Sequence, residues 1–430
     1  MKKIYLFFFL ISLYFASLVI FGSLVRHAAF KGPFSDNIII KLSDSMSKIP
    51  SNLKTYIFGG DLAIQKKDRL NISLKKKGLK IFINENLEEY ILVSKYFLDE
   101  NSFKLQLIDV LNNSIIYTWP QKRFTSTLSE SSGPGRYTFE HSMLLDGGDI
   151  LTTTGGEPIM KIDICGNKIW ENDMNTHHSI EIDKDKNIWA PIYLNEKKKL
   201  HGQTLQYHDG IGKIDINTGT TLFQKSLYDI LIENNLFDLM GNSYMGEDPL
   251  HLNDIEPVLE DGNFWKEDDL FLSLRNISLV LLYRPSTNKI IWYKFGPWRH
   301  QHDVDIIDKN KIAIFNNNTQ LGIKSVNRNS EILVYDFDNS RVGNIFDKLF
   351  VKHKIKTYYE GLFEKIDDKS IYVEEQENGR IIKGNMDGNI IWEYIWDAQI
   401  KWSRFYNNNN FKKVGNLSET VKNIKNNKCS

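Results

Sequence analysis

The feature that most constrains the fold is a short phrase that recurs along the chain. A β-branched or aromatic strand, a turn rich in asparagine and glycine, and a second strand that ends in tryptophan occur at 107–119, 161–170, 281–292 and 381–392, with a phenylalanine version at 213–223. Turns of this composition between alternating strands are typical of β-hairpins. An all-β repeat of roughly 40 to 60 residues is typical of propeller blades, whereas a sandwich or a single barrel does not require the same hairpin so often. We count five or six units and predict an all-β propeller. The repeated tryptophans should pack inside the blades: Trp119, Trp170, Trp292 and Trp392.

A second phrase carries histidine in place of tryptophan. It starts with His141, His178 and His302, has a longer version that starts with His251, and has Gly361 in a fifth copy. Because the inner strands of a propeller converge on its axis, residues at one phrase position should meet at the mouth of the channel. A single histidine of this kind more often only caps a turn. Four at one phrase position favour a shared pocket.

The polar residues around these phrases form the candidate site, which contains His177, His178, His251, Asn253, Arg275, His300 and His302. By phrase position, His302 rather than His300 points inward. Arg275 lies in an otherwise apolar run that we predict to be a strand, where an arginine is either paired internally or bound to an anion. Its place between two histidine phrases favours the anion. Several histidines with an arginine and an asparagine suit a small oxyanion. Zinc would need three ligands supported by carboxylates such as Asp254 and Asp303, but a guanidinium close to a divalent cation is unfavourable. We therefore predict no metal and no cofactor.

At these residues the chain resembles the arylsulfotransferase family, from about 78–82 to 400–406. The shared motifs are the histidine pair at 177–178, the His-x-Asn of 251–253 followed by Ser-Leu-Arg-Asn, and Gln-His-Asp at 301–303 followed by Phe-Asn-Asn-Asn. The resemblance implies a six-bladed propeller whose site lies at the central channel. It also implies transfer of a sulfuryl group from an aryl sulfate to a phenol without a nucleotide donor, in keeping with the lack of a P-loop motif.

The resemblance assigns a role to each site residue. His302 would attack the sulfuryl group and be transiently sulfated, and His178, His251, Asn253 and Arg275 would bind the oxyanion. His178 or His251 would also transfer protons. We add His177 and His300 as further substrate-binding residues. The chain departs from the best-known members in being shorter and in carrying an anchor where they have a signal peptide. The aromatic residues of the phenol pocket are not assigned, although four aromatics near motif ends are candidates: Trp298, Trp402, Phe405 and Tyr406.

The two ends of the chain differ from the repeated region. Residues 4–25 carry no charge and are long enough to cross a bilayer as a helix, which predicts a membrane anchor over 1–26 rather than a cleaved signal peptide. Lys2 and Lys3 would keep the start inside, so the propeller would lie on the periplasmic side. We further expect a linker over 27–70 that contains one short amphipathic helix, the propeller over 71–408, and a solvated, asparagine-rich tail over 409–430.

Composition excludes some partners and chemistry. Lysine plus arginine equals aspartate plus glutamate at 54 each, so no net field favours a nucleic acid. The two cysteines, Cys165 and Cys429, predict neither a disulfide nor a cysteine zinc site, because the tail offers little apolar sequence around Cys429. Histidines outside the phrase are expected to be solvated: His27, His201, His208 and His353.

Two other functions fit the same pattern. A membrane-tethered propeller could bind a protein or a glycan without catalysis, because this fold often serves as a scaffold. A metal-dependent hydrolase of the same fold would instead hold a metal tightly. Arg275 favours the transferase, because a scaffold has no reason to place a guanidinium at the channel.

Overall fold

The structure is a computed structural model, and it divides into two compact units, one of residues 1–70 with 198–205 and one of residues 71–197 with 206–430. The residues that it describes are 2–29, 37–43, 45–47, 77–97, 102–120, 139–153, 157–200, 203–205, 207–242, 248–319, 328–396, 398, 400–427 and 429.

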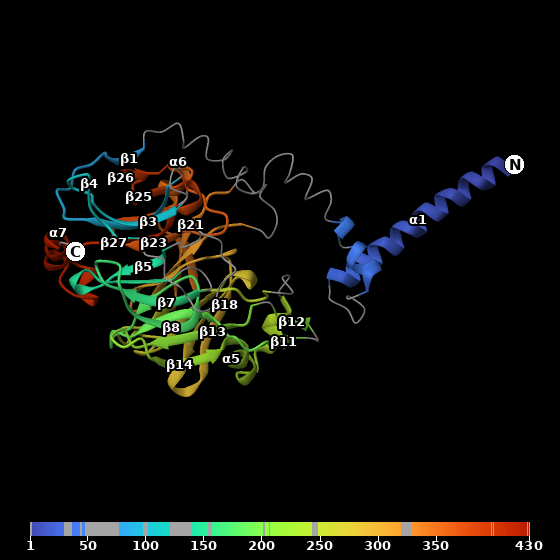
Figure 1. Ribbon diagram of the computed structural model, residues 1–430, viewed down its shortest axis with the longest axis horizontal. Coiled ribbons are helices and arrows are strands. Elements are labelled where there is room, and N and C mark those ends of the chain that lie inside the picture. The colour runs from blue at the N-terminus through green and yellow to red at the C-terminus, as the bar shows by residue number, and fades with distance from the viewer. Residues whose placement is uncertain are drawn as a thin grey trace. The chain divides into compact units, whose positions relative to one another are not determined.

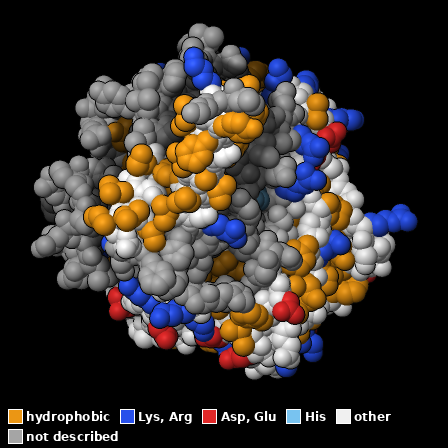
Figure 2. Space-filling model, turned by 90° about the vertical axis from the view of Figure 1, so that its right-hand side faces the viewer, with side chains coloured by type: hydrophobic (Ala, Val, Ile, Leu, Met, Phe, Trp, Pro, Cys, Tyr) orange, Lys and Arg blue, Asp and Glu red, His pale blue; other side chains and the backbone are white. Residues whose placement is uncertain are grey.

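The first unit contains the apolar helix that the sequence predicts, α1 (Lys2–Ala29). Its span from Lys3 to Arg26 is 24 residues long, or about 36 Å at 1.5 Å per residue, which exceeds the hydrocarbon thickness of a bilayer. Its apolar side chains are exposed, and Figure 2 shows hydrophobic side chains at the surface of the face that it draws. The helix is therefore long and apolar enough to span a membrane, and a signal sequence has the same properties.

The rest of this unit is small. A two-stranded hairpin is made by β11 (Lys199–Leu200) and β12 (Gln203–Thr204). Within the expected amphipathic helix, residues 38–43 and 45–47 are helical, whereas Pro50 and most of the expected linker over 27–70 lie outside the described residues.

The second unit is built from antiparallel sheets, so the predicted all-β class is confirmed (Figure 1). Three sheets have four strands each. The strands of each sheet are given in spatial order. The first sheet contains β15 (Leu252–Pro257), β16 (Leu270–Leu274), β17 (Leu279–Arg284) and β18 (Lys289–Phe295), and the second contains β19 (Val304–Asp308), β20 (Lys311–Asn316), β21 (Glu331–Asp336) and β22 (Arg341–Asn344). The third contains β27 (Ile400–Tyr406), β2 (Tyr90–Phe97), β3 (Ser102–Asp109) and β4 (Ser114–Thr118).

Two further sheets are larger. One has five strands, in the order β1 (Gly78–Ile81), β26 (Ile390–Ile395), β25 (Arg380–Asn385), β24 (Ser370–Glu375) and β23 (Leu362–Lys365). The other has eight strands, namely β5 (Glu140–Leu144), β6 (Ile150–Thr153), β7 (Glu157–Ile162), β8 (Lys168–Thr176), β9 (Glu181–Ile182), β10 (Ile188–Tyr193), β13 (Asp209–Ile214) and β14 (Thr221–Ser226).

The order of the strands makes this unit propeller-like. Apart from β8 and β9, which both pair with β10, and from the two ends of the repeat, strands that follow one another within a sheet pair with one another, as in the blades of a propeller. The two ends of the repeat are exchanged, because β27 pairs with β2 and β1 pairs with β26. The first and last sheets are therefore each completed by a strand from the other end of the chain. Two short helices connect strands: α5 (Leu227–Glu233) and α6 (Asp347–His353).

The repeated tryptophans pack as predicted. Trp119, Trp170 and Trp392 are buried, and Trp292 is partly buried against a cluster that contains Phe271 and Phe337. The aromatic end of each hairpin thus fills the interior of a sheet or the space between neighbouring sheets.

The C-terminal segment differs from the predicted solvated tail. Helix α7 (Leu417–Asn426) begins at Asn416, whose side chain accepts a hydrogen bond from the Glu419 amide. Leu417, Val421 and Ile424 are spaced along one face of this helix and are buried in a core cluster, which explains why the segment is folded.

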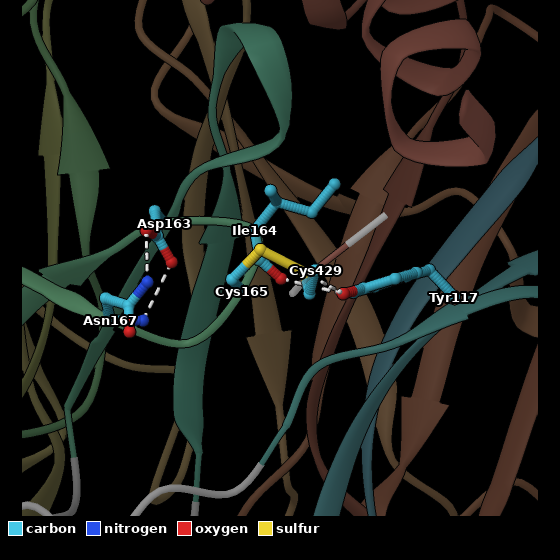
Figure 3. The surroundings of a disulfide bond; sticks show 6 residues. All are labelled: Tyr117, Asp163, Ile164, Cys165, Asn167 and Cys429. Carbon is cyan, nitrogen blue, oxygen red and sulfur yellow. Dashed lines mark hydrogen bonds between the residues drawn. A yellow bond between two sulfur atoms is a disulfide. The ribbon is translucent and has the colours of Figure 1, made fainter. Parts of the chain in front are cut away.

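A disulfide joins Cys165 to Cys429 (Figure 3), so the prediction of no disulfide is also wrong. Cys165 lies in the turn between β7 and β8. The Tyr117 hydroxyl donates a hydrogen bond to the Ile164 carbonyl oxygen at 2.9 Å and lies 3.3 Å from Cys429 Sγ. The apolar face of α7 supplies the anchoring that the sequence analysis did not find near Cys429.

Candidate functional site

Equivalent positions in neighbouring sheets are identified by a hydrogen bond that repeats between their inner strands. The Ile255 amide donates to Ser179 Oγ at 3.1 Å, and the Val304 amide donates to Asp254 Oδ2 at 3.0 Å. In the next pair, the Phe363 amide donates to Asp303 Oδ2 at 2.9 Å. Each acceptor therefore occupies the same place relative to the amide that is bound in the next sheet.

The residues that precede these acceptors are also equivalent, and this corrects the alignment of the histidine phrases. His178, Asn253, His302 and Gly361 share one position. His251 precedes that position by two residues and is the counterpart of His300, not of His302 as predicted. A β-bulge between Leu252 and Asp254 separates the two positions in β15, and both His251 and His300 have left-handed backbones, with φ of 55° and 51°.

The predicted gathering of the imidazoles is confirmed, with His178 at its centre. The ring centroid of His178 lies 4.9 Å from those of His177 and His251, 5.5 Å from that of His302, and 6.4 Å from that of His141. These five side chains come from segments that are far apart in the sequence. His141 belongs to the predicted phrase but was not among the predicted site residues.

Several nitrogen and oxygen atoms of this cluster lack a partner. Nε2 of His141, His177, His251 and His302, together with Oδ1 of Asn253, is buried and accepts or donates no hydrogen bond among the described residues. Buried polar groups in native proteins are nearly always hydrogen-bonded, so a group of such atoms in one place indicates a ligand site.

Two carboxylates that the sequence analysis missed contact the histidines. The Nδ1–H group of His251 donates to Asp248 Oδ2 at 2.5 Å, and the His251 amide donates to Asp209 Oδ2 at 3.0 Å. His177 Nε2 lies 3.6 Å from Asp209 Oδ1. The Nδ1 atoms of His177 and His178 are 2.6 Å apart, so one of them carries the shared hydrogen.

Arg275 lies close to the cluster. The prediction that it belongs to a strand is wrong. It begins a single 3₁₀ turn, η3 (Arg275–Ile277), between β16 and β17. Its amide donates to the His251 carbonyl oxygen at 3.1 Å. Its Nε donates to Asn276 Oδ1 at 3.2 Å and its Nη1 to the Tyr359 carbonyl oxygen at 3.4 Å, and it forms no ion pair within the described part of the chain.

Burial and the guanidinium keep the imidazoles neutral. Burial, and then the positive charge of Arg275, lower the pKa of His302 well below its usual value and also lower the pKa of His251. The same two causes lower the pKa of His300 to about 4. For His178, burial and the neighbouring His251 lower the pKa. At neutral pH the cluster therefore offers uncharged ring nitrogens beside the positive charge of Arg275 and, at His141, those of Arg404 and Lys401.

A cavity of about 520 Å³ opens onto the cluster and is lined by His141, Asn253, His302, Trp402 and Arg404, among others. The Trp402 ring stacks on His141 with 3.7 Å between centroids. Of the aromatic candidates, Trp402, Phe405 and Tyr406 line this cavity, whereas Trp298 is buried in a core cluster.

Carboxylates also line the cavity, including Glu181, Glu256, Asp305 and Glu364. Within the described residues, no group of three or more His, Cys, Asp or Glu side chains is arranged to hold a metal ion. Asp254 and Asp303, considered above as supports for zinc ligands, instead accept the hydrogen bonds between neighbouring strands.

The remaining histidines have separate roles. His208 was expected to be solvated but is buried, with ring nitrogens 2.7 Å from the Glu196 carbonyl oxygen and 2.9 Å from Ser226 Oγ. His353 is partly buried and its Nε2–H group donates to the Gly388 carbonyl oxygen at 3.0 Å. His201 and the side chain of His27 lie outside the described residues.

Comparison with known families decides the identity of this arrangement. The family model described as arylsulfotransferase (ASST) matches residues 141–397, more than half of the chain. The chain belongs to the arylsulfotransferase family. The matched range contains every member of the candidate site, from His141 and His177 through Arg275 to His302.

The solved structures that match this arylsulfotransferase family member do so at low identity. A protein of unknown function from Bacteroides caccae matches with a TM-score of 0.47 and 10% identity, covering 73% of this chain and 98% of its own. The β-propeller domain of Cps50 (Swd1) from Myceliophteria thermophila matches with a TM-score of 0.41 and 8% identity, covering 77% and 87%. BamB from Moraxella catarrhalis matches with a TM-score of 0.34 and 10% identity, covering 75% and 77%. No curated protein matches the chain.

Proposed function

We propose that the protein transfers a sulfuryl group from an aryl sulfate to a phenolic acceptor through a sulfated histidine. The observation that carries this proposal is the group of buried, unpartnered ring nitrogens near Arg275, of which those of His141 and His302 line a cavity large enough for an aromatic substrate. Membership of the arylsulfotransferase family supports the same reaction class. The substrates are small molecules, and neither a nucleotide nor a metal takes part.

In the first step, the Nε2 lone pair of His302 attacks the sulfur atom and an N–S bond forms. The bond between sulfur and the aryl oxygen breaks, and its electron pair stays on the departing phenoxide. A neighbouring imidazole, His178 or His251, gives a proton to this oxygen from its protonated form, which is the minor form at neutral pH because its pKa is lowered. The low pKa of His302 leaves its nucleophilic form populated at neutral pH.

In the second step, the acceptor phenol gives its proton to the imidazole that lost one. The acceptor oxygen then attacks sulfur, the N–S bond breaks, and its electron pair returns to His302. Each step thus restores the protonation state that the other requires. The transfer is divided into two displacements, and both of them can use the same proton carrier.

Negative charge on the transferring group is stabilised by fixed donors. By analogy with phosphoryl transfer, the charge spreads over the non-bridging and leaving oxygens. Arg275 supplies the positive charge with the largest effect on His302. Asn253, at the position equivalent to that of His302, donates one Nδ2 hydrogen to the Gln301 carbonyl oxygen at 2.9 Å, so only its second Nδ2 hydrogen is left for an oxyanion. One well-placed donor is typically worth about 3 to 4 kcal/mol in such sites.

Intact-mass analysis of the purified full-length chain after mixing with 4-nitrophenyl sulfate tests this reaction. We expect one added sulfuryl group on the parent, its loss when phenol is added, and no addition on His302→Asn. His353→Asn, which changes a partly buried histidine outside the cluster, is the matched control and should be sulfated like the parent. No addition on any protein would favour the non-catalytic propeller, and activity lost on chelation would favour the metal-dependent hydrolase.

We also propose six blades over 71–408, with the eight-stranded sheet counted as two. One of the two would contain β5 to β8, and the other would contain β9, β10, β13 and β14, joined to the first where β8 pairs with β10. The chain would be held by α1 as an uncleaved membrane anchor, with the propeller on the periplasmic side. The disulfide supports this side, because such bonds persist in oxidising compartments.

A further inference from the structure

We propose that Asp248 is a positioning residue that makes His251 the proton carrier of the transfer, and that His300, its counterpart in the next sheet, does not carry protons. This inference rests on the proposed function and assigns a step that the proposed function leaves open between His178 and His251. It concerns a carboxylate that does not itself contact the substrate and acts only through the imidazole.

The contact between these two residues fixes the hydrogen on the His251 ring. Because an ionised carboxylate only accepts, the 2.5 Å contact places a hydrogen on Nδ1. In the neutral ring, Nε2 then has the free lone pair, and this atom is buried without a partner among the described residues. The protonated ring presents an N–H group at the same place. His251 can therefore release and take up a proton at Nε2 without turning.

The backbone around this pair is held from several sides. The His251 amide donates to Asp209 Oδ2, and the Asp248 carbonyl oxygen accepts from Asn276 Nδ2 at 2.6 Å. The carbonyl oxygen of His251 accepts from the Arg275 amide. The turn that carries Asp248 and His251 is thus attached to the turn that carries the guanidinium. This attachment holds the backbone of His251, the proton carrier, at a fixed distance from the backbone of Arg275, the anion-binding residue.

His300 provides an internal comparison, because it has the same strand position and the same left-handed backbone. Its amide donates to Ser278 Oγ at 3.3 Å, but no carboxylate contacts its ring among the described residues. Burial and Arg275 oppose protonation at both rings, and only His251 has a carboxylate that favours it. Of these two equivalent histidines, His251 therefore has a carboxylate bound to its ring and His300 does not. A proton carrier requires such a partner to orient its ring.

The charged and titratable groups that face His251 act in opposite directions. Protonation of His251 is favoured by Asp248 and opposed by burial and by Arg275. A protonated His251 in turn lowers the pKa of His177, His178, His300 and His302. The second carboxylate nearby, that of Asp209, accepts from the backbone amide of His251 and not from its ring. Removing the Asp248 carboxylate therefore removes the one group that favours protonation of the ring among the causes of its shift. The pKa of His251 then falls further, and the protonated form becomes rarer at every pH.

Asp248→Asn tests the assignment through its dependence on the leaving group. In the full-length chain in detergent, we measure the burst of phenol release from 4-nitrophenyl sulfate and from phenyl sulfate. Phenoxide needs a proton to depart and 4-nitrophenoxide hardly does. We therefore expect Asp248→Asn to slow release from phenyl sulfate by about 100-fold or more, and release from 4-nitrophenyl sulfate by less than about threefold. The burst with phenyl sulfate should also decline with rising pH at a lower pH than in the parent.

Three controls separate this effect from a structural one. Asp173→Asn, on an exposed position of β8, should leave both donors unchanged. His300→Gln should slow both donors by the same factor. The double variant Asp248→Asn/His251→Gln should be no slower with phenyl sulfate than His251→Gln alone, because the carboxylate acts only through that ring.

Two outcomes would overturn the proposal while leaving the proposed function intact. The first is an Asp248→Asn variant that is sulfated but releases phenol from both donors with the same slowing. The second is a His300→Gln variant that shows the larger dependence on the leaving group. Failure of the proposed function is different and would be seen in the parent, as the lack of any sulfated protein with either donor.

Discussion

Replacing Cys429 with serine should destabilise the protein strongly, because the disulfide closes a very long loop. Cys165 and Cys429 are 264 residues apart in the sequence. In the chain-entropy model, a loop of this length contributes about 5 to 6 kcal/mol to the free energy of unfolding at 25 °C. Measured effects are commonly smaller than this model gives. We therefore expect the free energy of unfolding to fall by about 3 to 5 kcal/mol.

Urea unfolding of the full-length chain in detergent, followed by far-UV circular dichroism, measures this loss. The parent is compared with Cys165→Ser, Cys429→Ser and the double variant, each with and without a reductant. All three variants should match the reduced parent, because each lacks the same bond, and reductant should change only the parent. The reasoning is refuted if the oxidised parent and the variants unfold at the same urea concentration.

Two further predictions concern the site. Arg275→Gln should slow the burst of 4-nitrophenol release about 100- to 1000-fold at pH 7, because it removes the charge that stabilises the transferring group. A burst as fast as that of the parent would exclude the guanidinium from the reaction. The burst of the parent should stay constant from pH 8 to pH 6 and fall only at lower pH, because burial and Arg275 depress the pKa of His302 and keep its ring neutral. A decline that is already half complete near pH 6.5 would show an ordinary histidine.

The strands and their packing were predictable because their causes are local. The Asn-Gly and Asp-Gly turns define the hairpins, and the aromatic residue at the end of each hairpin has no polar face to expose. Trp119 and Trp392 are therefore buried wherever the sheets are placed. The meeting of His178 and His302 followed from the repeat, because equivalent positions converge in any closed arrangement of similar sheets.

The alignment of the histidines was less predictable. The bulge between Leu252 and Asp254 shifts His251 by two residues from the position that its phrase indicates. A bulge depends on the pairing with β16 and leaves no mark in the sequence. Asp209 and Asp248 were missed for a related reason. Asp209 is the first residue of β13 and Asp248 lies in a turn, and neither position belongs to a repeated phrase. Only the packing of that turn against η3 brings Asp248 to the His251 ring.

The C-terminal segment was misread because composition was weighed above spacing. Asparagine and lysine dominate 407–430, but Leu417, Val421 and Ile424 recur at the intervals of one helical face, after an asparagine that caps the helix. A pattern with three apolar residues is enough to fold a segment when a core cluster is already there to receive it. The disulfide then became possible because α7 places Cys429 beside Cys165.

The interaction that joins neighbouring inner strands also orients the candidate site. An acceptor at Ser179, Asp254 or Asp303 binds the amide of the next strand, and the residue before each acceptor lies at the common inner position. That residue is His178, Asn253 or His302 beside three of the inner strands. Beside the inner strand β23 it is Gly361. A Cβ atom at Gly361 would lie 2.8 Å from Thr357 Oγ1 and 2.9 Å from Phe315 Cε1, and its φ of 112° disfavours any side chain. The glycine is therefore required by sterics, and the site cannot be a symmetric ring of imidazoles. At this position the cavity is lined by Gly361 and not by an imidazole.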